Sequence, residues 1–230
     1  MLLSLFFACS SQVLDTHTRT LPAEALTGLR FDISAGDAIF IAEEGADAIT
    51  AEATVGAIVG PGHEPCDVMA AFTFVLDERG DEAVLEVGFE GAEHMGAWAD
   101  LVVTGPPHLI LTGEDSSGDL EIVDFAGLTL TEGSGDTSVF NISGDVDIED
   151  DSGDLWIDGV GGDLMVIDGS GDLNIYAVAG DVFIEDDSGD IRVDGVGGAV
   201  SVIDGSGDIR VSNAGSTDII EDGSGDIRLD

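Results

Sequence analysis

The chain has 230 residues, of which 43% are hydrophobic, and 48 acidic against six basic residues give a formal net charge of −42. Nucleic acid is excluded as a partner because phosphate binding needs a basic surface, and direct attraction to an anionic membrane is excluded for the same reason. The hydrophobic content also excludes a disordered acidic tail, since it is high enough to form a core.

Residues 1–12 resemble the end of an export signal. Leu2 begins an apolar run that is too short to span a bilayer and lacks a basic leading segment. Ala8 precedes Cys9, as a small residue precedes the lipidated cysteine of bacterial lipoprotein signals. We therefore expect an exported protein at the outer membrane or cell surface, with Cys9 as the lipid attachment site and no other contact with the membrane.

Residues 13–112 form a degenerate N-terminal β region. Residues 31–55 contain a Gly-Asp pair, with Gly36 and Gly45 nine residues apart. Residues 70–89 alternate like two strands around a polar turn at 77–81, which predicts a β-hairpin. No change in composition marks a linker, so we expect one continuous β body.

Residues 113–230 form a regular array with a period of nine residues. Each unit reads Gly-Asp, a branched aliphatic residue, any residue and a second aliphatic, as at Leu155 and Ile157. Alternation with a period of two predicts strands, and the glycine-rich segments between them predict corners. The glycines that set the register are Gly144, Gly153, Gly162, Gly171, Gly180, Gly189, Gly198 and Gly207.

One nine-residue unit cannot fold alone. Its two buried aliphatic side chains contribute about 3–6 kcal/mol, whereas ordering nine backbone residues costs on the order of 9–18 kcal/mol. Stacking closes this gap because each strand then pairs with the coils above and below it. The sequence therefore predicts an all-β fold, a flattened parallel β-solenoid with 18-residue coils made of two nine-residue half-coils.

Several segments resemble a known family. Arg30-Phe31-Asp32-Ile33 followed by Gly36-Asp37, the Leu101-Val102-Val103 strand before Pro106-Pro107, and the repeated GSGDI-x-V units are similar to the bacterial "putative adhesin" family of β-helix domains. The resemblance covers residues 28–230. It implies an exported, surface-associated protein and supplies no catalytic residues.

One column of aspartates recurs every 18 residues and is expected to stack along a corner. It either binds calcium weakly, or each carboxylate caps its own turn by accepting backbone N–H groups and faces solvent. We favour capping because the remaining ligands of known calcium-binding loops are missing. The column comprises Asp154, Asp172, Asp190, Asp208 and Asp226.

A second column shares the outward position between the two aliphatic residues. It contains Trp156, Asn174, Arg192, Arg210 and Arg228. It is either a strip for an anion or a glycan, with Trp156 as a stacking platform, or a set of arginines that neutralise the flanking aspartates. We favour neutralisation.

The opposite face carries an outward apolar column that we expect to include Met165, Phe183 and Ile219. Contiguous outward apolar residues indicate a contact surface, so these three and Trp156 are the candidate contact residues. The expected occupant is residues 60–100 of the same chain, with a second copy or another protein as the alternative.

No catalytic or phosphate-binding motif is present, and tight corners from residue 136 onward leave no pocket there. His63 and Cys66 are three apart, without the four-ligand spacing of structural zinc.

We therefore predict a non-catalytic exported surface protein, an adhesin or envelope scaffold that presents a rigid acidic solenoid to an envelope or surface partner. It needs no cofactor. The alternatives are a polysaccharide-processing β-helix enzyme, which would need a cleft with converging carboxylates, and a calcium-stabilised binding scaffold. The uncapped last strand also predicts either end-to-end self-association or shielding of its edge by charge alone.

Overall fold

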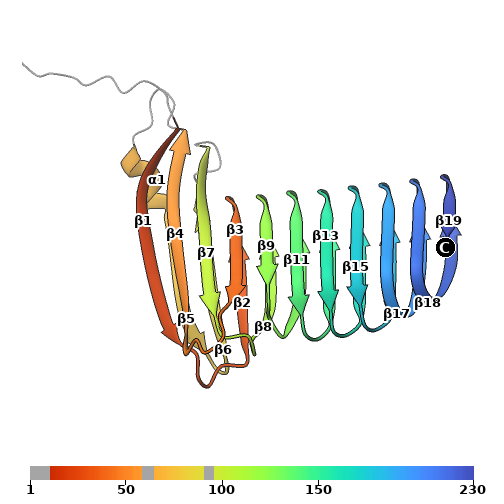
Figure 1. The fold of residues 1–230 in the computed structure, drawn as a ribbon. Coiled ribbons are helices and arrows are strands. Elements are labelled where there is room, and N and C mark those ends of the chain that lie inside the picture. The colour runs from red at the N-terminus through yellow and green to blue at the C-terminus, as the bar shows by residue number, and fades with distance from the viewer. Residues whose placement is uncertain (1–10, 59–64, 91–95) are drawn as a thin grey trace, which may run out of the picture.

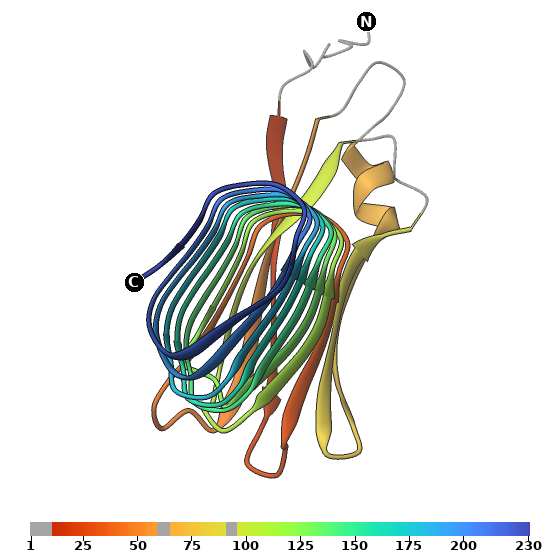
Figure 2. The same cartoon turned by 90° about the vertical axis from the view of Figure 1, so that its right-hand side faces the viewer.

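The computed structural model describes residues 11–58, 65–90 and 96–230. Two β-sheets face each other and run the length of a stack of coils, as Figures 1 and 2 show. The predicted fold class is confirmed: the fold is a parallel β-solenoid in which each coil of about 18 residues gives one strand to each sheet.

The strands are described by sheet, in their spatial order along the stack. The first sheet contains β5 (Phe72–Arg79), β6 (Glu82–Phe89), β2 (Gly28–Ile33), β8 (Ile110–Asp115), β10 (Gly127–Glu132), β12 (Val146–Asp150), β14 (Leu164–Asp168) and β16 (Val182–Asp186). The second sheet contains β1 (Ser11–Pro22), β4 (Ala48–Ile58), β7 (Ala97–Gly105), β3 (Ala38–Ala42), β9 (Leu120–Val123), β11 (Thr137–Ile142), β13 (Leu155–Val160), β15 (Leu173–Val178) and β19 (Ile227–Leu229). Two long strands pass through a corner and belong to both sheets, β17 (Ile191–Asp204) and β18 (Ile209–Asp222).

The aliphatic residues of the repeat stack in register inside the solenoid. Leu155 pairs with Leu173, Leu173 with Ile191, and Ile191 with Ile209, and all four are buried. Each side chain packs against its counterparts one coil above and one coil below. This is the arrangement that the nine-residue period predicts, because no single coil buries enough apolar surface by itself.

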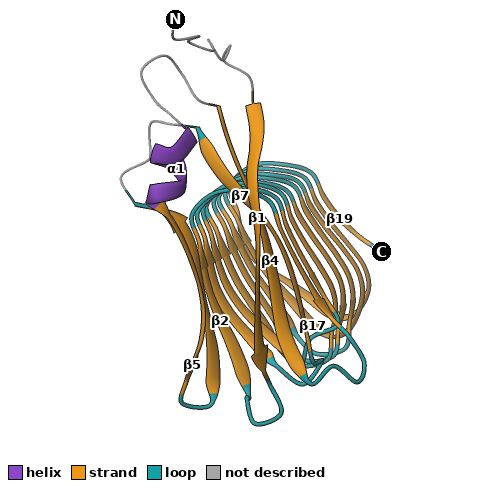
Figure 3. Ribbon diagram, turned by 90° about the vertical axis from the view of Figure 1, so that its left-hand side faces the viewer, coloured by secondary structure: helices purple, strands orange, loops and turns teal. Residues whose placement is uncertain are grey.

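The N-terminal half extends the same two sheets in an order that differs from the chain order. The coil of β2 and β3 lies between the coil of β6 and β7 and that of β8 and β9. The predicted hairpin is present as the antiparallel pair β5–β6. β1, β4 and β7 form a second antiparallel group, visible in Figure 3, and α1 (Pro65–Ala71) lies at this end of the stack.

One corner of each coil depends on a glycine with positive φ. Gly171 has φ +152°, and a Cβ at this position would lie 1.7 Å from the carbonyl oxygen of Gly153 in the neighbouring coil. No side chain fits there. The recurring glycine is therefore required by the close approach of successive coils. Within the described ranges, no helix is both long and apolar enough to cross a membrane.

Candidate functional site

The predicted aspartate column lies on the outside of a corner and joins successive coils. The backbone N–H of each aspartate donates to the Oδ1 of the aspartate one coil earlier, over distances of 2.9–3.1 Å, for Asp154, Asp172, Asp190, Asp208 and Asp226. The expectation that each carboxylate caps its own turn is wrong, because the amide that it caps belongs to the next coil. In each of these aspartates except Asp226, one carboxylate oxygen therefore already accepts a hydrogen bond. No group of three metal-ligating side chains occurs among the described residues.

A different acidic column is buried inside the solenoid, and the sequence analysis missed it. Its members end the strands of the first sheet and pair directly with one another from coil to coil. Six of them are only 1–4% exposed. We call it the inner carboxyl column: Asp115, Glu132, Asp150, Asp168, Asp186, Asp204 and Asp222.

The inner carboxyls share one hydrogen-bonding pattern. In each of the first six, one oxygen accepts the backbone N–H of the serine two residues later, as from Ser170 to Asp168 over 3.0 Å. The other oxygen is buried and has no hydrogen-bond partner. The serine contact turns the chain at the corner, but it leaves half of each carboxyl without compensation for its lost hydration.

Burial raises the pKa of these carboxyls. Loss of hydration raises the pKa of Asp115 to about 6 and those of Asp168 and Asp186 to about 7, and the serine N–H groups offset only part of the effect. Burial also raises the pKa of Asp204. The pKa values of Glu132 and Asp150, which are adjacent, are both raised, first by burial.

The column of aromatic and arginine residues forms an exposed strip on the second sheet. Trp156, Asn174, Arg192, Arg210 and Arg228 pair in register through β13, β15, β17, β18 and β19, as their spacing predicts. Trp156 is 42% exposed. A shallow groove of about 440 Å³ runs between this column and the outer aspartates. We call these five residues, together with Tyr176, the aromatic–arginine strip.

Tyr176 joins this strip from the next outward position of β15. Its ring centroid lies 5.0 Å from that of Trp156, and the Arg192 guanidinium carbon lies 5.8 Å from the centre of the Tyr176 ring. Arg210 pairs with Asp230 at 3.4 Å. Within the described part of the chain, Arg192 and Arg228 have no ion pair within 4.0 Å. Arg192 and Arg210 nevertheless act on the flanking Asp194 and help to lower the pKa of its carboxyl, so the expected neutralisation is present there without a close ion pair from Arg192.

The apolar column on the opposite sheet is shorter than expected. Met165 and Phe183 pair and face outward, beside a shallow groove of about 390 Å³. Ile219 pairs instead with the inward Val202 and packs against the core, because the corner of β18 between Ala214 and Ser216 is one residue shorter than the matching corner of β17. The extra residue, Ile220, forms a bulge and is exposed. The predicted place of Ile219 in this outward column is therefore wrong.

The described parts of residues 60–100 do not cover this column. They form α1, β5, β6 and the start of β7, which lie at the N-terminal end of the stack (Figure 1). Met165 lies further along, on β14, and is exposed. The expected intramolecular cover is thus absent from the part of the chain that the structure describes.

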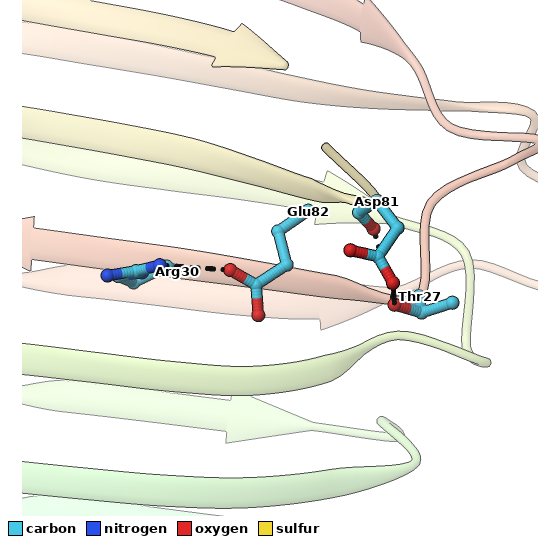
Figure 4. Close-up of polar contacts among 4 residues, drawn as sticks. All are labelled: Thr27, Arg30, Asp81 and Glu82. Atoms are coloured by element: carbon cyan, nitrogen blue, oxygen red, sulfur yellow. Dashed lines mark hydrogen bonds and ion pairs between the residues drawn. The ribbon is translucent and has the colours of Figure 1, made fainter. Parts of the chain in front are cut away.

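A third groove, of about 340 Å³, lies where the N-terminal half meets the regular array. Two ion pairs lie beside it, from Arg30 to Glu82 at 3.0 Å and from Arg79 to Glu86 at 3.1 Å. Figure 4 shows Arg30 and Glu82, with Thr27 hydrogen-bonded to the Asp81 carboxylate at 3.2 Å. Arginine engages the half-buried Glu82 and Glu86, whereas the exposed Asp32 and Glu114 line the groove and pair in register on adjacent strands.

Three residues named from the sequence have no described side-chain position. Cys9 and His63 lie outside the described residues, and the Cys66 side chain is not described. Lipid attachment at Cys9 therefore stays a prediction.

Proteins of known structure share this fold. A "putative adhesin" from Bacteroides fragilis superimposes with a TM-score of 0.52 at 13% identity, covering 94% of this chain and 97% of that one. A "putative lipid binding protein" from Parabacteroides distasonis superimposes with a TM-score of 0.52 at 13% identity, covering 94% and 96%. No curated protein sequence matches the chain. The Toastrack DUF4097 family matches residues 109–230, more than half of the chain, and the protein belongs to this family.

Proposed function

We propose that the protein is a non-catalytic, exported scaffold that binds a partner protein through the aromatic–arginine strip. The observation that carries the proposal is the strip itself: the exposed Trp156 and Arg192 lie together with the half-buried Tyr176 on a rigid sheet. Tryptophan, tyrosine and arginine are the residues that most often dominate the energy of protein interfaces. The fold shared with the protein described as a "putative adhesin" supports a role in surface binding.

Rigidity favours such a role. The strip residues project from parallel strands whose inward neighbours, such as Ile175 and Val193, are buried in the core. Little conformational entropy is therefore lost when the strip meets a partner. Trp156 offers a large apolar surface, and the guanidinium groups of Arg192 and Arg228 are free to pair with carboxylates of the partner.

The charge around the strip adds selectivity. Asp194 lies beside Arg192 and Arg210, and it accepts a hydrogen bond from Asn213 Nδ2 at 2.7 Å, which lowers the pKa of its carboxyl. The strip thus carries fixed charges of both signs, with the outer aspartates along one edge. A partner must match this pattern, and the net charge of −42 makes encounter with it dependent on salt.

The experiment is photo-crosslinking in cells that produce the full chain. A photoreactive residue replaces Asn174, in the centre of the strip, and in a matched control it replaces Phe183 on the opposite sheet. We expect one crosslinked protein species from position 174 alone, lost when Trp156→Ala and Arg192→Glu are added. Equal crosslinking from both positions, or no effect of these substitutions, would contradict the proposal.

Export is tested on the same cells. Antibody or protease added to intact cells should reach the chain, and mass spectrometry of the membrane fraction should find an acylated Cys9. A chain found only inside the cell would overturn the exported role. Crosslinking between two copies of the chain through position 174 would replace the partner protein with self-association.

A further inference from the structure

The inner carboxyl column is continuous through the regular array. Its seven members pair directly on β8, β10, β12, β14, β16, β17 and β18. At the N-terminal end, Asp115 pairs with the apolar Ile33, so the column begins there. Six buried acids and a half-buried seventh, Asp222, at one equivalent position are far more than chance placement of surface aspartates would give.

Each member has an oxygen that lacks a partner. The unpartnered atoms are one carboxyl oxygen of Asp115, Glu132, Asp150, Asp168, Asp186, Asp204 and Asp222. Adjacent coils are about 4.8 Å apart, so each such oxygen lies close to the carboxyls above and below. A fully ionised column would place a negative charge at every coil in a dry environment, which is strongly unfavourable.

The charged groups around the inner carboxyl column do not compensate its negative charge. The charged groups that act on the column from neighbouring turns and strands are themselves acidic: Asp37 on Asp115, Asp136 and Asp151 on Asp150, Asp172 and Asp187 on Asp186, and Asp190 on Asp204. The arginines of the array lie on the outer face of the second sheet. A small cation bound within the column would neutralise part of this negative charge.

A proton fits this column better than a metal ion. Calcium takes six to eight oxygen ligands, whereas each coil offers one free carboxyl oxygen, and the other already accepts a serine N–H. The described residues contain no group of three side chains suited to a metal. A proton needs only two oxygens, one that carries it and one that accepts it.

We propose that the inner carboxyl column is a proton-binding site, in which several carboxyls are neutral acids at neutral pH and share their protons with adjacent coils. A neutral acid supplies the donor that the unpartnered oxygens lack. Burial raises the pKa values of its members, which supports this assignment. The solenoid thus takes up protons as it folds, and acid strengthens the contact between coils.

The first test is infrared spectroscopy of the full chain in D2O at pH 7. We expect the carbonyl stretching band of a neutral carboxylic acid in the unaltered folded protein. The double substitution Asp168→Asn and Asp186→Asn keeps the shape and the serine contact, and it should reduce the band. The matched control, Asp163→Asn and Asp181→Asn, changes exposed aspartates at the other corner of the coil and should leave the band unchanged.

The second test counts protons. Calorimetric unfolding at pH 6 in buffers of different ionisation enthalpy should show that the inner double variant takes up about two fewer protons on folding than the unaltered chain. Absence of the acid band from the folded, unaltered protein would overturn the proposal, whether or not the variants fold. Stoichiometric metal found by elemental analysis would overturn it equally, because the column would then hold a metal ion.

Discussion

Raising the pH from 5.5 to 8 should destabilise the solenoid through the inner carboxyl column. A group whose pKa is raised by folding stabilises the folded state fully below its unfolded pKa, and this contribution is lost as the pH rises through the folded pKa. For Asp168 and Asp186 the two values are 3.8 and about 7. The folded state therefore binds more protons than the unfolded chain throughout this window, and the free energy of unfolding falls with pH.

The magnitude follows from these values. At pH 5.5, a shift from 3.8 to about 7 contributes about 2 kcal/mol for each of Asp168 and Asp186, and almost nothing remains at pH 8. Asp115, with a pKa of about 6, adds about 1 kcal/mol. The three groups together predict a loss of about 5 kcal/mol, a large part of the stability of an ordinary domain.

The assay is urea unfolding across this pH range at constant ionic strength, because a net charge of −42 makes stability sensitive to salt. The variant carrying Asp168→Asn and Asp186→Asn should lose about 4 kcal/mol of the pH dependence. The two proteins differ only at these two carboxyls, so the difference between them isolates the column. Equal pH dependence in the two proteins, or a stability that rises with pH, would refute the reasoning.

Three further outcomes are expected. Ile175→Ala, at a fully buried position between Ile157 and Val193, should cost about 2–5 kcal/mol in urea unfolding, and a loss below 1 kcal/mol would show that the interior is not packed there. Ala177→Gly should raise the melting temperature by relieving φ +54°, worth about 1 kcal/mol, whereas a lower melting temperature would mean that this residue is not in the left-handed region. A chelator should leave the melting temperature unchanged, because one oxygen of each outer aspartate, such as Asp172, already accepts a backbone N–H; a drop would favour the calcium-stabilised scaffold.

The regular half of the fold could be predicted because its period is set by local chemistry. Leu155 and Leu173 stack because each coil repeats the same turn and the same alternation. The outward column that contains Trp156 and Arg192 follows from the same 18-residue spacing of equivalent positions. The order of the N-terminal coils could not be predicted, because β2 and β3 are inserted between strands that occur later in the chain, and such pairing leaves no periodic signal.

The inner carboxyl column was missed for a reason that the sequence itself contains. Asp168 precedes a glycine-rich corner, which is typical of a turn residue, but it has the same parity as the inward residues Leu164 and Val166. Continuing the alternation by one step would have placed it inside. Ile219 was misplaced because a fixed period of 18 was applied across a corner of β18 that is one residue short, a deficit that the bulge at Ile220 restores.

The stacking of coils in register is tested most directly by disulfide formation between outward positions. With Cys9 and Cys66 replaced by serine, Asn174→Cys and Arg192→Cys place two thiols on paired residues of adjacent coils, about 4.8 Å apart between Cα atoms and within disulfide range. Asn174→Cys with Arg210→Cys spans two coils and is the control. The account predicts rapid oxidation of the first pair within one chain and none of the second. Oxidation of the second pair, or failure of the first in a folded chain, would contradict it.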